Sequence, residues 1–161
     1  MRILGIDPGL AITGWAVVDF DRDSKPIPVD YGAITTLKGL SVSERLVEIY
    51  DDMNSLIKKF KPEYAGVETL LFTNNAKTAM SVGEARGVVL LVLEKNNIPI
   101  REFTPPQVKN SITGYGRANK KQVQENVKVL CGLEDIPKPD DAADAIAIAI
   151  ATEVLESRKT L

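Results

Sequence analysis

Histidine is absent from this sequence of 161 residues. Its absence removes the commonest general base and the usual nitrogen ligand of zinc sites. Hydrolytic chemistry would therefore have to use carboxylates, lysines or hydroxyls. Because Asp and Glu provide hard oxygen ligands, an active site built from them favours Mg²⁺ or Mn²⁺ over Zn²⁺ or Cu²⁺.

Cysteine occurs only once, at Cys131, so no disulfide can form within the chain. This scarcity fits a reducing compartment, and we expect a cytoplasmic protein. The first residues lack the basic, apolar and small-residue stages of a signal peptide, and no apolar run approaches the ~18 residues of a membrane span. The length is typical of one domain, so we expect a single domain over residues 1–161.

The net charge of −2 argues against a protein that coats nucleic acid with its whole surface. The charges are nevertheless unevenly distributed. Residues 107–128 carry five positive charges against Glu125 alone, namely Lys109, Arg117, Lys120, Lys121 and Lys128. Residues 134–144 reverse the sign, with five acidic residues against Lys138 alone. A basic face beside an acidic cluster suits an enzyme that acts on a polyanion, although an ordinary solvated surface explains the pattern equally well.

Apolar runs and turn residues predict five strands, over residues 2–7, 13–20, 28–36, 64–68 and 98–103. The first predicted helix has a clear signature: Ser41 and Glu44 form a capping box, and apolar residues recur at three- and four-residue steps until Pro62. Further helices are predicted over residues 75–95 and after residue 105. This order predicts an α/β protein with a five-stranded mixed sheet flanked by helices on both faces.

Asp7 and Glu68 end the first and fourth predicted strands. A right-handed crossover through the first helix would make these strands parallel neighbours, with carboxyl ends ~5 Å apart. Pro8 and Gly9 turn the chain away after Asp7, and an unpaired buried carboxylate there would be costly. A turn-capping role for Asp7 and a solvent-facing charge at Glu68 are the structural alternatives.

Asp141 and Asp144 stand three residues apart at the start of an alanine-rich helix predicted over residues 140–158. Their spacing places both side chains on one face of that helix. A helix with so little bulk can lie very close to a sheet, which would bring both carboxylates to Asp7 and Glu68. Acidic residues also stabilise a first helical turn through the macrodipole, so the pair alone supports either interpretation.

Four carboxylates that converge from two strands and one helix would hold two hard cations ~3.5 to 4 Å apart. One ion would activate a water, and the other would stabilise the leaving oxygen of a phosphodiester. Such a site requires no histidine. The candidate catalytic and metal-binding residues are therefore Asp7, Glu68, Asp141 and Asp144.

Six motifs occur in order along nearly the whole chain: GIDPG at 5–9 with Gly14, VE at 67–68, GEARG at 83–87, PPQVK at 105–109, GYGRANKKQVQ at 114–124 and DAADAIAIA at 141–149. Together they resemble the RuvC family of Holliday junction resolvases. The resemblance implies a ribonuclease H-like nuclease domain. It also implies a homodimeric endonuclease with two Mg²⁺ per active site, for which Mn²⁺ would substitute. Its substrate would be a four-way DNA junction, in which it would nick two opposed strands during recombination and repair. Its partner would be a branch-migration complex of the RuvA and RuvB type.

The resemblance places the family's acidic quartet on the same four carboxylates, although many relatives have histidine at the position of Asp141. The lysines that hold junction phosphates correspond to Lys109 and Lys120. We add Lys121 and Arg117 as neighbouring DNA contacts. Ordinary solvated helix charges are the alternative for all four basic residues.

The segment after Glu68 departs from the family pattern. Relatives often place an aromatic residue three positions later, where it contacts bases at the crossover. Here that position is Leu71, and Phe72 follows it. A leucine can wedge between bases but cannot stack on them as a ring does. We predict that one of the two residues contacts DNA and that the other has a core role.

Other functions stay open on the sequence alone. Asp7 with Gly9 and Gly14 also resembles the phosphate-binding hairpin of sugar kinases and actin-like ATPases, but 161 residues leave little room for the second domain that those proteins need. A ribonuclease H-like enzyme acting on RNA, or a junction-binding module without catalysis, would share the phosphate contacts, which do not reveal the sugar. The acidic quartet argues against lost catalysis, and only the resemblance favours DNA.

Overall fold

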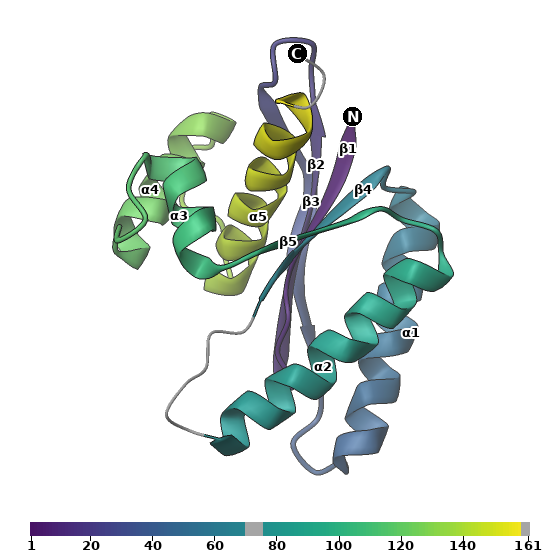
Figure 1. Cartoon of the computed structure of the whole chain (residues 1–161). Helices are drawn as coiled ribbons and strands as arrows, with labels where there is room; N and C mark the ends of the chain where they lie inside the picture. Colours follow the sequence, from purple (N-terminus) through teal and green to yellow (C-terminus); the bar gives the residue numbers. More distant parts are fainter. Residues whose placement is uncertain (70–75, 159–161) are drawn as a thin grey trace.

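The computed structural model describes residues 1–69 and 76–158. One mixed sheet has the strand order β3-β2-β1-β4-β5, with α1 and α2 on one face and α3, α4 and α5 on the other (Figure 1). The strands are β1 (Arg2–Asp7), β2 (Ile12–Phe20), β3 (Pro26–Thr35), β4 (Tyr64–Glu68) and β5 (Ile100–Phe103). The helices are α1 (Val42–Phe60), α2 (Ala76–Lys95), α3 (Pro105–Thr113), α4 (Lys120–Cys131) and α5 (Asp140–Ser157). The predicted five-stranded α/β architecture is confirmed.

The central strand β1 pairs antiparallel with β2 and parallel with β4. In the parallel register Ile6 lies opposite Val67, so Asp7 and Glu68 are the next residues at the same end of the sheet. Parallel pairing follows from the crossover through α1, which returns the chain to the far side of β1. The predicted neighbourhood of the two strand ends is therefore confirmed.

Helix α1 illustrates how local sequence sets the boundaries of an element. The side chain of Ser41 accepts a hydrogen bond from the backbone N–H of Glu44, and the Glu44 side chain accepts one from the backbone of Ser41. The helix buries Ile49, Met53 and Ile57 against the sheet. These residues recur with helical spacing, so one face of α1 enters the core while the other stays in water.

Helix α5 lies unusually close to the other face of the sheet because glycines and alanines meet there. A Cβ added to Gly5 of β1 would come within 2.8 Å of the backbone nitrogen of Ala149. A Cβ added to Gly66 of β4 would come within 2.8 Å of Cγ2 of Ile148. Gly5 and Gly66 are register partners, so together they form a flat strip on which α5 rests. The predicted close approach of the alanine-rich helix is confirmed.

The helices differ little from the sequence-based expectation. Within residues 1–69 and 76–158, none combines the length and the apolar character that crossing a bilayer would require.

The loop after α3 begins at Gly114, whose φ of 72° closes the helix in a left-handed cap. Glycine adopts that conformation without strain, which explains why α3 ends where it does.

Candidate active site

Two carboxylates occupy the adjacent carboxyl ends of β1 and β4. Asp7 is the last residue of β1, Glu68 is the last residue of β4, and both are half-buried. Asp7 pairs with Gly14 of β2, and Glu68 pairs with Phe103 of β5, so the sheet holds the backbone at both positions. The interpretation of Asp7 as a mere turn cap receives no support, since its side chain accepts no hydrogen bond from the described residues of the following turn.

Helix α5 adds acidic residues to this end of the sheet. Asp7 pairs with Gly14 across β1 and β2, and a Cβ on Gly14 would lie 2.8 Å from the Cβ of Asp141. Asp141 thus packs directly over the residue that is paired with Asp7. One helical turn later, Asp144 is half-buried and points toward the same end. Glycine at position 14 is what allows the first turn of α5 to reach the sheet.

The four carboxylates interact electrostatically. Burial raises the pKa of Asp7 to about 7, and repulsion from Asp144 and Asp141 adds to the effect. Burial likewise raises the pKa of Glu68 to about 8, with further repulsion from Asp7 and Asp144. Burial is the larger cause for both groups, and the added repulsion indicates that the neighbouring carboxylates lie within electrostatic reach. The carboxylates of two strand ends and one helix therefore lie at the same end of the sheet, and their roles in catalysis and metal binding stay predictions.

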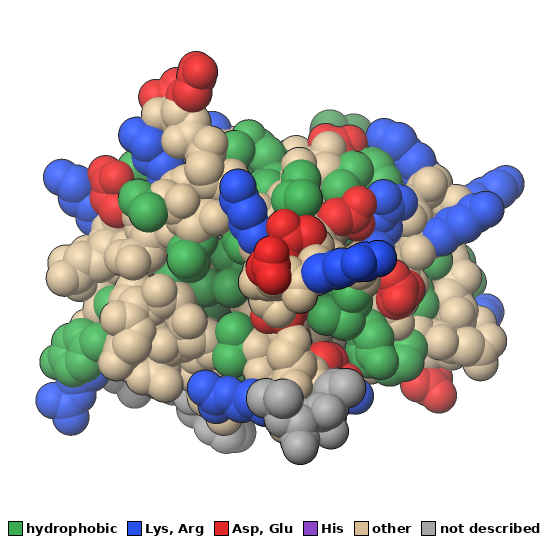
Figure 2. All heavy atoms as spheres, turned by 90° about the horizontal axis from the view of Figure 1, so that it is seen from above, with side chains coloured by type: hydrophobic (Ala, Val, Ile, Leu, Met, Phe, Trp, Pro, Cys, Tyr) green, Lys and Arg blue, Asp and Glu red, His purple; other side chains and the backbone are tan. Residues whose placement is uncertain are grey.

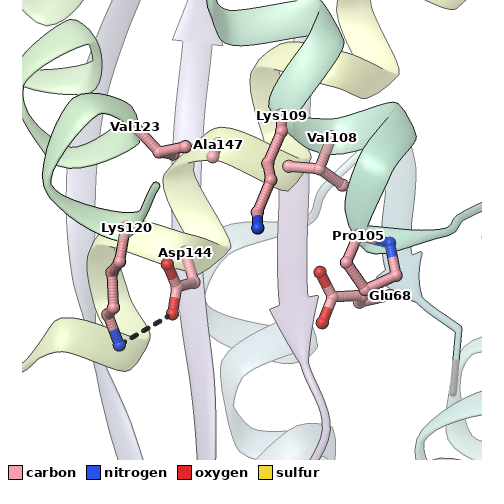
Figure 3. Close-up of a pocket in the computed structure, with 8 residues that line it drawn as sticks. All are labelled: Glu68, Pro105, Val108, Lys109, Lys120, Val123, Asp144 and Ala147. Carbon is pink, nitrogen blue, oxygen red and sulfur yellow. Dashed lines mark ion pairs between the residues drawn. The ribbon is translucent and has the colours of Figure 1, made fainter. Parts of the chain in front are cut away.

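A pocket of about 220 Å³ opens beside these carboxylates. Glu68 and Asp144 line it together with Lys109 of α3 and Lys120 of α4. Figure 3 shows Lys109 reaching into the space between Glu68 and Asp144. The remaining wall of the pocket is apolar and is formed by Pro105, Val108, Val123 and Ala147. Acidic and basic groups thus face each other across a partly apolar hollow, which strengthens their interaction.

Lys120 has carboxylate partners of its own. Its Nζ lies 3.5 Å from Asp144 Oδ2 and 3.5 Å from Asp140 Oδ2 (Figure 3 shows the Asp144 pair). Asp140 was not among the sequence-based candidates. The signal was present, since residues 140 and 144 are one helical turn apart and share a face. Lys120 and Lys109 also oppose the rise in pKa at Asp7 and Glu68, respectively.

No three acidic or cysteine side chains within residues 1–69 and 76–158 lie close enough to enclose one metal ion as the side chains stand. The carboxylates repel one another, and lysine ammonium groups lie among them instead. The donor chemistry nevertheless fits hard cations, because the converging ligands are all carboxylate oxygens.

Comparisons with known proteins identify the family. The profile for Crossover junction endodeoxyribonuclease RuvC matches residues 3–152. A curated protein of that name from Caldicellulosiruptor saccharolyticus is 48% identical over 161 residues, covering 100% of this chain and 96% of the relative. Another from Fusobacterium nucleatum is 52% identical over 150 residues, covering 93% of this chain and 78% of the relative. This chain belongs to the RuvC family.

Solved RuvC structures agree with that assignment. The structure described as T. thermophilus RuvC in complex with Holliday junction substrate superposes with a TM-score of 0.93 at 31% identity, covering 99% of this chain and 97% of that chain. A yeast mitochondrial Holliday junction resolvase, Ydc2, shares the fold with a TM-score of 0.68 at 18% identity, covering 99% of this chain and 84% of that one. The ribonuclease H-like fold of the RuvC family is therefore the fold of this chain.

The other predicted DNA contacts include two basic residues that the structure describes. Lys121 and Arg117 are not among the residues that line the pocket, so their assignment as DNA contacts stays a prediction. Leu71 and Phe72 fall outside the described residues. Lys109 and Lys120 line the pocket with Glu68 and Asp144, and their assignment as DNA contacts also stays a prediction.

The opposite end of the molecule differs in charge. Figure 2 views the end where β1 begins and α5 ends, and acidic and basic side chains are interspersed over it. Arg2 pairs with Asp19 at 2.7 Å, and Arg101 pairs with Glu156 at 2.5 Å. At this end of the RuvC-family chain, these pairs match acidic with basic side chains.

Proposed function

We propose that this protein is a structure-selective endonuclease that resolves four-way DNA junctions by paired, metal-dependent nicks during recombination and repair. The observation that carries the proposal is the convergence of Asp7, Glu68, Asp141 and Asp144 at one end of the sheet, beside two lysines. Membership of the RuvC family supports the junction substrate. The RuvC structure solved with a Holliday junction supports it further, because the fold matches over 99% of this chain.

The four carboxylates would hold two Mg²⁺ ions, with Mn²⁺ able to substitute. Bound there, the ions supply Lewis-acid activation of water and stabilisation of the leaving oxygen. The raised pKa values of Asp7 and Glu68 support this assignment, because burial and neighbouring carboxylates disfavour their negative charge and a bound cation would stabilise it. Mg²⁺ is selected over Zn²⁺ by the absence of histidine and of a second cysteine.

The chain's own residues would orient the scissile phosphate. Lys109 projects between Glu68 and Asp144, where its ammonium group can pair with a non-bridging phosphate oxygen. Lys120, which pairs with Asp144 in the structure, would pair with a DNA phosphate when the substrate is bound. The apolar wall formed by Val108, Val123 and Ala147 would limit water to the attacking molecule. Strand ends and helix α5 would keep these groups in place.

A homodimer is part of the proposal, because two symmetric nicks require two active sites. Helix α2 offers a surface for it. Met80 and Leu91 are 68% and 54% exposed, and Glu84 and Gly87 lie between them on the same helical face. A Cβ on Gly87 would meet nothing within 4 Å, so a second helix could approach there. A cytoplasmic location and cooperation with a branch-migration complex of the RuvA and RuvB type complete the proposal.

Incubation with four matched nucleic acids tests the proposal: a synthetic four-way junction, linear duplex DNA, an RNA–DNA hybrid and single-stranded RNA, each with Mg²⁺, Mn²⁺ or EDTA. We expect paired symmetric nicks in the junction alone, in either metal, and none in EDTA. Cleavage of the hybrid with an intact junction would favour the ribonuclease alternative. Binding of the junction without any cleavage would favour a module that has lost catalysis.

A further inference from the structure

The turn between β1 and β2 is held by two buried hydroxyl groups. Thr13 Oγ1 donates to the carbonyl oxygen of Gly9 at 2.7 Å, and Thr36 Oγ1 donates to the carbonyl oxygen of Leu10 at 2.6 Å. Thr13 is 0% exposed and Thr36 is 4% exposed. This turn follows Asp7 directly in the chain, so the hydroxyls fix the backbone next to the active site.

Arg45 of α1 is attached to this network by one nitrogen. Its Nε donates to Thr36 Oγ1 at 2.7 Å. A guanidinium has five N–H groups, so the remaining four stay available to a ligand. Across the part of the chain that the structure describes, Arg45 forms no ion pair. The nearby Glu44 and Glu48 instead accept backbone hydrogen bonds from Ser41 and Leu37, respectively.

Arg45 lines a groove of about 340 Å³ between the β1–β2 turn and the start of α2. Thr78, Ser81 and Val82 form the α2 side, and residues 9–12 form the turn side. Ile12 is 42% exposed. The groove therefore combines one cation that lacks an ion-pair partner among the described residues with hydroxyl groups and an aliphatic wall. That combination suits a phosphodiester with its deoxyribose, because the phosphate needs the guanidinium and the sugar has an apolar face.

The groove and the active-site pocket lie on opposite sides of the β1 end. The pocket is formed by α3, α4 and α5, whereas the groove is formed against α1 and α2. Figure 1 shows α1 and α2 beginning at the end of the sheet where β1 terminates. Gly9, which lines the groove, is two residues from Asp7. A nucleic acid bound at the carboxylates could therefore continue across the turn into the groove.

We propose that the groove at Arg45 is a second phosphodiester-binding site for the DNA substrate. The inference rests on the proposed function and deepens it, since it assigns a contact away from the scissile phosphate. Arg45 binds a non-bridging oxygen, and Ile12 and Val82 contact the sugar. Through Thr36, the arginine also braces the turn that follows Asp7, so the contact lies beside the active site without belonging to it.

Junction binding measured by fluorescence anisotropy over a series of salt concentrations, in EDTA, tests the site. We expect R45Q to weaken binding about ten-fold. It should also reduce the salt slope, which is the slope of the logarithm of the binding constant against the logarithm of the salt concentration, by about 0.9, the value for a single phosphate neutralised by the protein. R45K keeps the charge and should keep most of the slope. R22Q removes an exposed arginine from the β2–β3 turn at the opposite end, so it is the matched control and should behave as wild type.

Two further variants separate binding from folding. S81D places a negative charge in the groove without touching the bond between Arg45 and Thr36, and we expect it to weaken junction binding at an unchanged melting temperature. T36V removes the buried hydroxyl, so it should lower the melting temperature while keeping the salt slope. If R45Q and S81D both leave the slope at the wild-type value, the site is refuted.

Light scattering on the same variants identifies a different occupant. A change in oligomeric state in R45Q, with an unaltered salt slope, would overturn the DNA site in favour of a protein contact. Failure of the proposed function has a different signature. Wild-type protein that binds no junction would contradict the function itself, whereas wild-type binding that R45Q leaves unchanged would contradict the groove alone.

Discussion

The two ends of helix α5 carry acidic residues in opposite circumstances. Near the C-terminal end of α5, Glu153 accepts hydrogen bonds from Ser24 Oγ, at 2.5 Å, and from Ser157 Oγ. One turn later Glu156 forms a two-pronged pair with Arg101, at 2.5 Å to Nε and 3.2 Å to Nη2. Each of these carboxylates has a donor of its own. Both carboxylates at this end of the helix are therefore hydrogen-bonded within the protein, Glu156 by a cation and Glu153 by hydroxyl groups.

At the beginning of α5 the carboxylates outnumber their partners. Asp141 and Asp144 face Asp7 and Glu68, and Lys109 and Lys120 offset only part of the repulsion. The pKa of Asp144 is raised by burial even though Lys120 opposes the rise. An unmatched buried charge lowers the free energy of unfolding, and a bound cation would offset this loss of stability. The comparison separates acidic residues that are hydrogen-bonded within the fold from those that we propose to serve chemistry.

The largest expected effect is on cleavage. Asp7→Asn or Glu68→Gln should reduce Mg²⁺-dependent junction cleavage by at least about 10³-fold, because a metal ligand is removed where transition-state charge develops. Junction binding should stay within a few-fold of wild type. Single-turnover cleavage and anisotropy measure the two quantities. Glu156→Gln, from the matched end of α5, is the control and should cut normally; equal losses in both would erase the distinction between the ends.

The next effect depends on the close contact between α5 and β2. Gly14→Ala would place a methyl group within 2.8 Å of the Asp141 Cβ, and the first turn of α5 would have to shift. A displacement on the order of 1 Å at a catalytic group can cost about 10²-fold in rate. Cleavage kinetics test this expectation. Gly39→Ala is the matched control, since a Cβ there would meet nothing within 4 Å; if both variants cut at the wild-type rate, Asp141 is not needed in its present position.

A smaller effect is expected on binding. Lys109→Ala or Lys120→Ala should weaken junction binding about ten-fold and flatten its salt dependence by about 0.9 for each phosphate that the protein no longer neutralises. Lys25→Ala removes an exposed lysine from the opposite end, so it should leave the slope unchanged. Titration of the junction at several salt concentrations measures the slopes. Identical slopes for all three variants would mean that Lys109 and Lys120 do not bind DNA.

The smallest effects concern stability, and substitutions at the two ends of α5 should change the melting temperature in opposite directions. The pKa of Asp7 is about 7 in the folded protein against 3.8 for the free group, so folding takes up a proton between these values. Stability of the metal-free protein therefore falls as pH rises through that interval and levels off above it. Asp7→Asn should raise the melting temperature in EDTA, and more at pH 9 than at pH 5.

Glu156→Gln should do the reverse, lowering stability by about 1–2 kcal/mol at both pH values because the partly buried Arg101 loses a charged partner. A change of 1 kcal/mol corresponds to about 2–4 °C in a protein of this size. Thermal melts in EDTA at the two pH values compare the variants. A fall in melting temperature for Asp7→Asn at pH 9 would show that Asp7 is matched by the protein after all.

Much of the fold was predictable because its signals are local. The capping box at Ser41, the helical spacing of Ile49, Met53 and Ile57, and the Pro8–Gly9 break after Asp7 act over a few residues. The pairing of β1 with β4 also followed, because the handedness of a crossover leaves one arrangement. The acidic quartet could be proposed because its members stand at strand ends and in a first helical turn.

Other features could not be read from the chain. Nothing near Lys120 in sequence indicates that it pairs with Asp140 and Asp144, since α4 and α5 meet only in the packed protein. No sequence pattern distinguishes Arg45 either, because its role depends on Thr36 from the end of β3. The segment with Leu71 and Phe72 lies outside the described residues, so its predicted contact with DNA stays a prediction.

The sequence by itself determined the elements, their order and which carboxylates end up at one edge of the sheet, because turn chemistry, capping and apolar periodicity act locally. Tertiary structure alone decided how near those carboxylates come and which cations balance them. The physical reason is that Coulomb energy and desolvation depend on separation and burial across elements distant in sequence. Gly5, Gly66 and Gly14 fix that separation by letting α5 settle onto the sheet.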